Sequence, residues 1–166
     1  TKNGLFIFDQ NKIENHFTKK DGLPSNVILD LDAKGNEELW LATANGLSKF
    51  NGKDFLNFSG DSGLPSKLVT AVHVDRQKSG TVWTGSENSG LTRYDENGFF
   101  TYSTQDGLPG NSIRDITQLS NGDLVLAVYN KGVAFYDRES FQLIDKNLDD
   151  KRVIIVTEGP KNLIWA

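Results

Sequence analysis

A Gly-Leu-Pro loop that recurs about every forty residues constrains the fold of this chain more than any other feature. It is found as DGLPSN at 21–26, DSGLPSK at 61–67 and DGLPGN at 106–111. Alignment on the loop places repeat starts at Gly22, Gly63 and Gly107, with a degenerate fourth start at Asn147. Successive starts are 41, 44 and 40 residues apart. Self-similarity at this period indicates one supersecondary unit that is repeated along the chain.

Each unit contains four short stretches rich in Val, Ile, Phe, Tyr and Trp, separated by Gly, Asn, Asp, Ser or Pro. In the first unit they centre on Ile28/Leu31, Leu39-Trp40, Gly46-Leu47 and Phe55/Phe58. Such stretches are typical of strands, and no window sustains a helical apolar period over ten positions. Four strands in about 42 residues is the spacing of a propeller blade. We therefore predict an all-β fold, a β-propeller of four-stranded antiparallel blades with four repeats.

The fourth repeat is divided between the two ends of the chain. Residues 147–166 align with the first half of a unit, and residues 1–21 reproduce the second half. We expect one propeller domain or propeller segment over residues 1–166, with a fourth blade shared between the termini. Pairing of the two halves would close a four-bladed ring. Two alternatives remain open: two chains that join into an eight-bladed ring, and a segment of a larger propeller. Because the chain contains no methionine, we expect a mature or excised segment.

The aromatic and histidine residues fit a structural interpretation. Trp40, Trp83 and Trp165 occupy one repeat position with apolar neighbours, which predicts packing between blades rather than stacking on sugar rings. His73 lies in a strand pattern and is expected to be a partly buried strand residue. His16 is expected to replace the second aromatic residue of a last strand, at the outer edge.

Taken together, the landmarks are GLPSN, the apolar pair that follows it, LWLAT, GL, FNG and a closing pair of aromatics. This series resembles the two-component-regulator propeller repeat, and the resemblance covers essentially the whole chain. It implies an extracytoplasmic, periplasmic ligand-sensing module of a bacterial two-component-type signalling protein, with oligosaccharides as a possible ligand class. The implied partner is the remainder of a sensor kinase or another protein. The third unit departs from the pattern, with Val125 in place of tryptophan.

Composition and motifs exclude several classes of function. The net charge of −4 and the absence of any Lys/Arg run longer than two argue against nucleic-acid binding. There is no cysteine, and no apolar run is long enough for a membrane span. Asp30 and Asp32 begin like a calcium loop, but Lys34 stands at the fifth-position ligand, so we favour a turn. No serine in a Gly-Leu-Pro loop has a histidine partner in its own repeat. We predict no catalytic residue, no metal site, no cofactor and no membrane contact by this segment.

If the chain binds a ligand, the site is expected at the axial mouth, where the loops that lead into the innermost strands converge. Positions whose residues differ between repeats are the best candidates, because residues that pack between blades are expected to be alike in every repeat, whereas residues that recognise a ligand can differ. We therefore predict a carbohydrate or other small-molecule site formed by Asn26, Lys67, Asn111, Arg114, Tyr129 and Lys151. A structural or protein–protein interaction propeller, a homodimer among its forms, is the alternative. An enzyme would need convergent carboxylates at the mouth, which the sequence does not indicate.

Overall fold

The computed structural model describes residues 1–35, 38–144, 152–160 and 163–166. Its three complete sheets are four-stranded and antiparallel, and each runs in chain order from an inner to an outer strand. Blade 1 contains β3 (Ile28–Ala33), β4 (Leu39–Thr43), β5 (Gly46–Phe50) and β6 (Phe55–Phe58). Blade 2 contains β7 (Val69–Val74), β8 (Val82–Ser86), β9 (Leu91–Asp95) and β10 (Gly98–Tyr102). Blade 3 contains β11 (Ile113–Gln118), β12 (Leu124–Val128), β13 (Gly132–Tyr136) and β14 (Phe141–Leu143).

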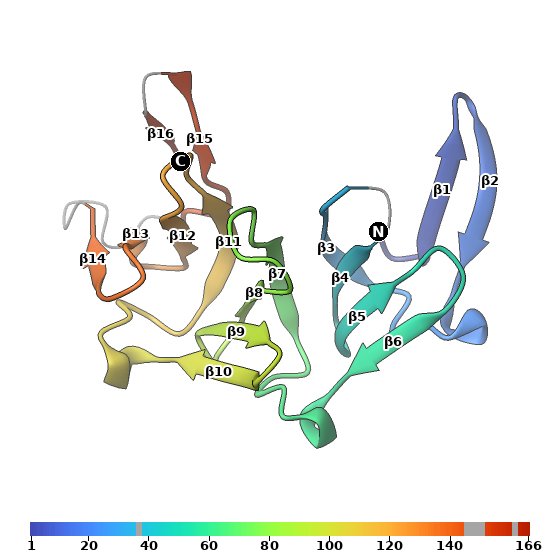
Figure 1. The fold of residues 1–166 in the computed structure, drawn as a ribbon, viewed down its shortest axis with the longest axis horizontal. Coiled ribbons are helices and arrows are strands. Elements are labelled where there is room, and N and C mark those ends of the chain that lie inside the picture. The colour runs from blue at the N-terminus through green and yellow to red at the C-terminus, as the bar shows by residue number, and fades with distance from the viewer. Residues whose placement is uncertain (36–37, 145–151, 161–162) are drawn as a thin grey trace.

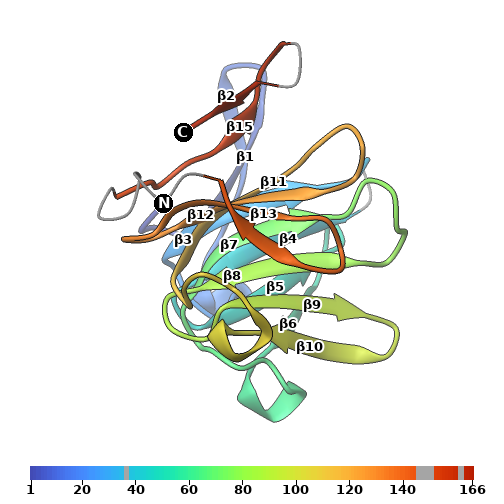
Figure 2. The same cartoon turned by 90° about the vertical axis from the view of Figure 1, so that its left-hand side faces the viewer.

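These sheets confirm the predicted all-β propeller architecture. They are arranged along an arc, with the inner strands β3, β7 and β11 on its concave side (Figure 1), and they lie one behind another in the side view (Figure 2). The second strands are buried on both faces, which explains their continuous apolar sequences. Core clusters fill each space between neighbouring blades.

The Gly-Leu-Pro loops connect the outer strand of one blade to the inner strand of the next. Each follows a single 3-10 turn: η1 (Lys19–Asp21), η2 (Gly60–Ser62) and η3 (Thr104–Asp106). The glycine after each turn has a positive φ, between 89° and 107°, which glycine adopts without strain. The next residue is a buried leucine, Leu23, Leu64 or Leu108, that packs between two blades. The loop therefore serves as a connector and as a part of the core.

Both halves of the fourth blade are present, but they do not pair with each other. The N-terminal half is β1 (Leu5–Asp9) with β2 (Lys12–Phe17), and the C-terminal half is β15 (Thr157–Glu158) with β16 (Ile164–Trp165). Among the described residues they form two separate sheets on opposite flanks of the molecule (Figure 1). The predicted intramolecular seam is thus not formed, because the two hairpins lie on opposite flanks of the arc.

Two aromatic predictions need correction at these flanks. Trp40 and Trp83 are 3% and 2% exposed, as predicted for core residues, whereas Trp165 is 58% exposed. The reason is that no blade packs beyond β16 in the described structure. In the pairing of β1 with β2, the register shifts by one residue between Ile7 and Phe8, and Phe17 rather than His16 stands opposite Leu5. His16 instead stacks on Phe6, with ring centroids 4.0 Å apart.

Candidate functional site

The carboxylates of the inner strands connect neighbouring blades. Asp30 Oδ2 accepts a hydrogen bond from the backbone N–H of Val72 at 2.8 Å, and Asp115 Oδ2 accepts one from Val156 at 2.8 Å. Each of the two carboxylates also accepts a bond from the next N–H of its own strand. Burial raises the pKa of Asp30 above its ordinary value despite those bonds. The carboxylates that line the inner strands therefore hold blades together.

His73 lies between two blades at the centre of the arc. Its Nδ1 is 3.4 Å from Asp32 Oδ2, and its Nε2 is 3.3 Å from Gln118 Oε1. Burial lowers the pKa of His73, and the nearby Asp32 opposes that effect only in part. Asp32 also accepts a hydrogen bond from Val74 N and pairs with Arg76 at 2.5 Å. The histidine is a partly buried strand residue, as its sequence pattern predicted, and its polar contacts are structural.

A different polar group lies deeper between blades 2 and 3. Asp75 is fully buried and accepts hydrogen bonds from Trp83 Nε1 at 3.0 Å, Gln118 Nε2 at 3.0 Å and Arg138 Nη1 at 2.9 Å. Burial alone would raise the pKa of Asp75, but the hydrogen bonds from Trp83, Gln118 and the backbone outweigh it and hold the pKa well below its ordinary value. This group stabilises the joint and faces no open site.

The mouth of the arc brings together two of the predicted site residues, Arg114 and Tyr129. The guanidinium carbon of Arg114 lies 4.7 Å from the centre of the Tyr129 ring, and that of Arg152 lies 6.0 Å from the same ring. Arg114 Nη2 is 3.4 Å from Glu87 Oε1. Within the described structure, Arg114 Nε is buried without a hydrogen-bond partner. Two guanidinium groups thus lie near one aromatic ring, and among the described residues Glu87 is the carboxylate that pairs with Arg114.

The other predicted site residues have different environments. Asn26 Oδ1 and Asn111 Oδ1 accept bonds from the first N–H of the preceding 3-10 turns, at Lys19 and Thr104 respectively. Their backbone carbonyls, like that of Lys67, accept a bond from a glycine of the preceding blade. Asn26 and Asn111 are therefore connector residues, while the Lys67 side chain is exposed. Lys151 lies outside the described residues.

Arg152 is the mouth residue that sequence reasoning missed. The comparison between repeats selected Lys151 and the residues at the equivalent position of the other units. Arg152 stands one position later, where the three complete units have Val27, Leu68 and Ser112. Only the fourth unit has a charged side chain there. The same rule, applied one residue later, would have identified it.

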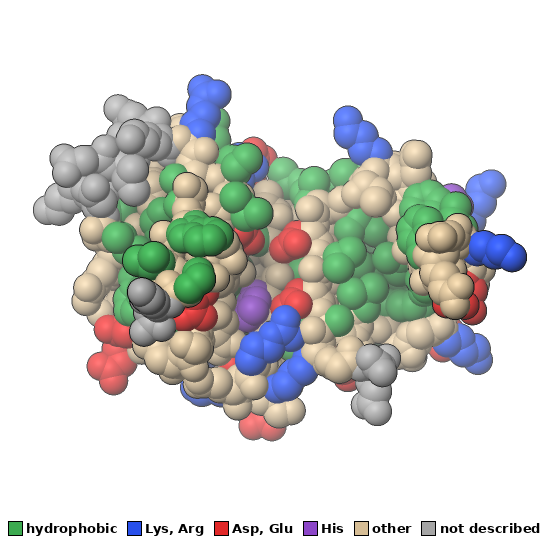
Figure 3. Space-filling model, turned by 90° about the horizontal axis from the view of Figure 1, so that it is seen from above, with side chains coloured by type: hydrophobic (Ala, Val, Ile, Leu, Met, Phe, Trp, Pro, Cys, Tyr) green, Lys and Arg blue, Asp and Glu red, His purple; other side chains and the backbone are tan. Residues whose placement is uncertain are grey.

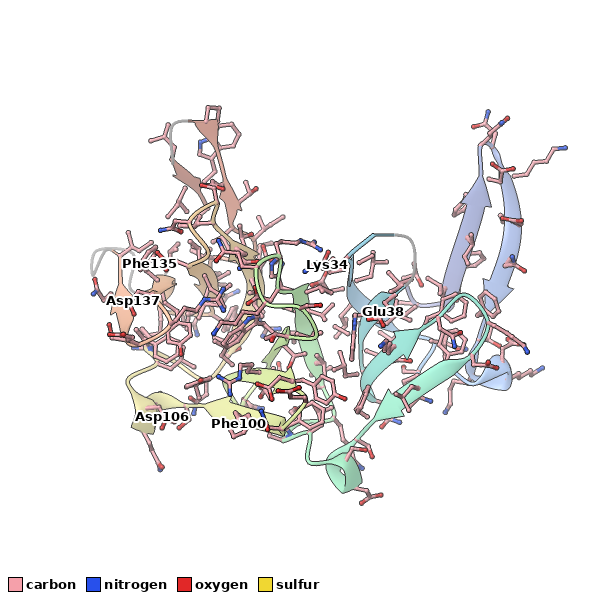
Figure 4. All side chains as sticks on the ribbon, in the orientation of Figure 1. Lys34, Glu38, Phe100, Asp106, Phe135 and Asp137 are labelled. Carbon is pink, nitrogen blue, oxygen red and sulfur yellow. The ribbon has the colours of Figure 1, made fainter. Side chains whose placement is uncertain are left out.

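A hollow of about 790 Å³ lies between blades 1 and 2, at the end of the inner strands opposite to Arg114 and Tyr129. Lys34 and Glu38 line it, and both are labelled in Figure 4. Three of the charged side chains that line it are already engaged, since Lys49 Nζ is 2.5 Å from Glu38 Oε1 and Lys34 Nζ donates to the carbonyl of Asp75. The mouth is therefore the better candidate for a ligand site.

The described part of the chain contains neither a cluster of metal-binding side chains nor a helix that could span a membrane. No three His, Cys, Asp or Glu side chains gather there as potential metal ligands. No helix there has the length and apolar character to cross a membrane.

Comparison with known proteins supports the fold. No protein-family profile matches the sequence, and no curated protein matches it. Among solved structures, the extracellular domain of a putative hybrid two-component system from B. thetaiotaomicron superposes with a TM-score of 0.75 at 23% identity over 87% of this chain. A second such domain from that organism gives 0.67 at 24% identity, also over 87% of the chain. The chain spans 22% and 19% of those two domains.

Virginiamycin B lyase from Staphylococcus aureus also shows this fold, with a TM-score of 0.64 and 18% identity over 84% of this chain and 48% of the lyase. The chain therefore has the propeller fold of sensor extracellular domains and of at least one enzyme. That is the fold implied by its resemblance to the two-component-regulator propeller repeat.

Proposed function

We propose that this chain is an extracytoplasmic ligand-binding propeller module of a bacterial two-component-type sensor, and that its ligand is an acidic oligosaccharide bound at the mouth. The observation that carries the proposal is the placement of Arg114 and Arg152 against the ring of Tyr129. The similarity to extracellular domains of two-component systems supports the cellular setting and the remainder of a sensor as partner.

The chemistry of the mouth fits a carboxylated sugar. A guanidinium group presents a planar fork of donors that matches a carboxylate, and Arg114 Nε has no partner within the described structure. An aromatic face such as that of Tyr129 offers an apolar surface for the C–H side of a sugar ring. Within the described residues, Glu87 pairs with Arg114 and no ion pair involves Arg152, so the described cluster favours an anion over a neutral ligand.

Binding rather than catalysis is favoured by the state of the carboxylates. Proteins with this fold include the extracellular domain of a two-component system and a lyase, so only the side chains can favour one class of function. A glycosidase requires one carboxyl group free to donate a proton and a second free to act as base or nucleophile. Asp30, Asp32 and Asp115 each accept two backbone N–H bonds instead. One of the two bonds comes from the carboxylate's own strand and the other from the neighbouring blade, so these carboxylates serve the structure.

A binding experiment tests this proposal. The protein is titrated with uronic-acid-containing oligosaccharides and with neutral oligosaccharides of the same length, by calorimetry at low and at physiological salt. We expect binding of the acidic series only, weaker at higher salt because charge attraction is screened. Arg114→Gln should weaken it by about tenfold or more, since a hydrogen bond to a charged group contributes about 1.5–3 kcal/mol.

Arg93→Gln is the matched control. In the wild type, the guanidinium carbon of Arg93 lies 4.7 Å from the centre of the Phe100 ring, the same distance as between Arg114 and Tyr129. This pair lies on β9 and β10, away from the mouth (Figure 4). This variant should bind like the wild type. Equal losses in both variants, or binding of the neutral series alone, would contradict a mouth site for acidic sugars. No binding of any sugar would favour the structural or protein-interaction alternative.

A further inference from the structure

The joint between blades 1 and 2 and the joint between blades 2 and 3 share one packing arrangement. In each, a buried tryptophan from the second strand of one blade lies against a tyrosine from the third strand of the next. The ring centroids of Trp40 and Tyr94 are 5.7 Å apart, and those of Trp83 and Tyr136 are 5.9 Å apart. Both joints lie between complete blades, so their equivalent positions can be compared directly.

At the joint between blades 2 and 3, a side chain of the protein fills the space beside the tryptophan. The guanidinium carbon of Arg138 lies 5.1 Å from the centre of the Trp83 ring. Arg138 Nη1 is 2.9 Å from Asp75 Oδ2, and Arg138 Nε donates to the carbonyl of Gly122 at 2.9 Å. The same carboxylate oxygen accepts the indole N–H of Trp83 at 3.0 Å. The indole, the carboxylate and the guanidinium group thus satisfy one another.

At the joint between blades 1 and 2, the same two positions carry the opposite charges. Lys34 has the position of Asp75, because each follows the last paired residue of an inner strand. Glu96 has the position of Arg138, in hairpin loops of equal length. In the described structure these two side chains form no ion pair, and Lys34 Nζ donates to the carbonyls of Asp75 and Arg76 at 3.2 and 3.4 Å. The ion pair that fills the other joint is therefore missing here.

The hollow of about 790 Å³ lies where this ion pair would stand. Trp40 and Glu96 are among its lining residues, as is Tyr94. Trp40 Nε1 has no hydrogen-bond acceptor within the described structure, whereas Trp83 Nε1 donates to Asp75. The Trp40 side chain is buried, so an acceptor for its N–H has to come from within the hollow.

The charges that line the hollow are balanced only in part. Lys49 Nζ pairs with Glu38, and Asp95 pairs with Arg93 at 3.0 Å. Within the described structure, three further lining charges take part in no ion pair: Lys34, Lys78 and Glu96. Figure 3 shows basic and acidic side chains side by side where blade 1 meets blade 2. A simple anion would leave the carboxylate without a partner and a simple amine would leave the lysines without one, so the hollow matches a ligand that carries both charges.

We propose that this hollow binds a zwitterionic ligand, a free amino acid or a short peptide, between blades 1 and 2. The ligand's carboxylate accepts the indole N–H of Trp40 and pairs with the ammonium groups of Lys34 and Lys78. The ligand's ammonium group pairs with Glu96. The bound molecule thereby supplies the ion pair that the joint between blades 2 and 3 contains in its own side chains. This site is separate from the mouth, because it lies at the opposite end of the inner strands.

Ligand titration tests the class of ligand first. The 166-residue chain is screened by ligand-observed NMR against the standard free amino acids and against short peptides with free ends, and the tightest binder is titrated by calorimetry. An analogue acetylated at the amino group and one amidated at the carboxyl group should each bind at least about tenfold more weakly, because each has lost one charge pair. The lengths of the binders distinguish amino acids from peptides. Absence of any binder, or equal binding of a capped analogue, would overturn the proposal.

The indole N–H signals of the protein report where the ligand binds. The chain has three tryptophans, and each signal is assigned by its loss in the matching Trp→Phe variant. On titration, the signal of Trp40 should shift downfield because its N–H gains an anionic acceptor. The signal of Trp83 should stay in place, because this N–H already donates to Asp75. A shift at Trp83 or Trp165 without one at Trp40 would place the ligand elsewhere and contradict the proposal.

Two variants separate binding in the hollow from effects on folding. The charge exchange Lys34→Asp/Glu96→Arg copies the residues of the filled joint and should weaken binding at least about 30-fold, because it removes groups that pair with both ends of the ligand. Lys78→Gln leaves the hollow open and should weaken binding about tenfold. Lys53→Gln, at an exposed lysine of blade 1 outside the lining, is the control and should bind like the wild type. Urea midpoints show whether each variant is folded, and unchanged affinity in Lys78→Gln or in a folded charge-exchange variant would overturn the proposal.

Discussion

The joint between blades 1 and 2 and the joint between blades 2 and 3 use different polar groups at equivalent places. At the first, Asp30 and Asp32 reach across from β3 to the backbone of β7. At the second, the position of Asp30 is taken by Ala71, which has no polar atom in its side chain. The buried carboxylate of Asp75 takes over there, with Trp83, Gln118 and Arg138 as its partners.

The difference shows how repeated blades tolerate unequal sequences. The backbone geometry of the blade is fixed by glycines, apolar spacing and the loop, which recur. The polar connection between blades differs from joint to joint, but the buried polar groups described at each joint are hydrogen-bonded. The joint from blade 3 to β15 has the same arrangement as the first joint, because Asp115 accepts a hydrogen bond from the backbone N–H of Val156. Two joints thus rely on partly exposed carboxylates and one relies on a buried ionic group.

The largest expected effect is at the buried group. Asp75→Ala should lower the free energy of unfolding by about 3–5 kcal/mol, because it leaves the Arg138 guanidinium without its buried counter-charge. Urea denaturation followed by tryptophan fluorescence measures the change. Asp61→Ala, at an exposed carboxylate of η2, serves as control and should change stability by less than about 0.5 kcal/mol. A loss below about 1 kcal/mol for Asp75→Ala would show that the joint does not depend on this carboxylate.

A smaller effect is expected where the carboxylate is partly exposed. Asp30→Ala should cost about 1–3 kcal/mol, since it leaves the N–H of Val72 unsatisfied inside the joint. Asp115→Ala has the same geometry at another joint and should cost about as much. The two urea midpoints should therefore shift together and by less than that of Asp75→Ala. If Asp30→Ala or Asp115→Ala shifted the urea midpoint more than Asp75→Ala does, the proposed order of the joints would be wrong.

Sequence reasoning predicted the repeated features well and the contacts between varying residues only in part. The Gly-Leu-Pro spacing and the tryptophan position predicted the blades and the burial of Trp40 and Trp83, because each recurs and packing depends on it. Asn26 and Asn111 were predicted to bind ligand, and in the structure their side-chain oxygens cap the loops through contacts seven residues away, which no spacing rule indicated. The contact of Arg114 with Tyr129 joins two strands at the mouth. No spacing rule in one sequence indicates such a pair.

The pH dependence of stability should distinguish the two types of joint by sign. The pKa of Asp75 in the folded state is below its ordinary value of 3.8, so the stability it contributes is complete above pH 3.8 and is lost as the pH falls further. The pKa of Asp30 is above 3.8, so the folded state binds its proton first and stability from this group rises as the pH falls toward 3.8. Urea midpoints of the wild type, Asp75→Asn and Asp30→Asn between pH 7 and 3 measure both effects. On acidification, the urea midpoint of the wild type should fall relative to that of Asp75→Asn. Over the same pH range it should rise relative to that of Asp30→Asn. If both differences in urea midpoint changed in the same direction with pH, the pKa values of Asp75 and Asp30 would not be shifted in opposite directions.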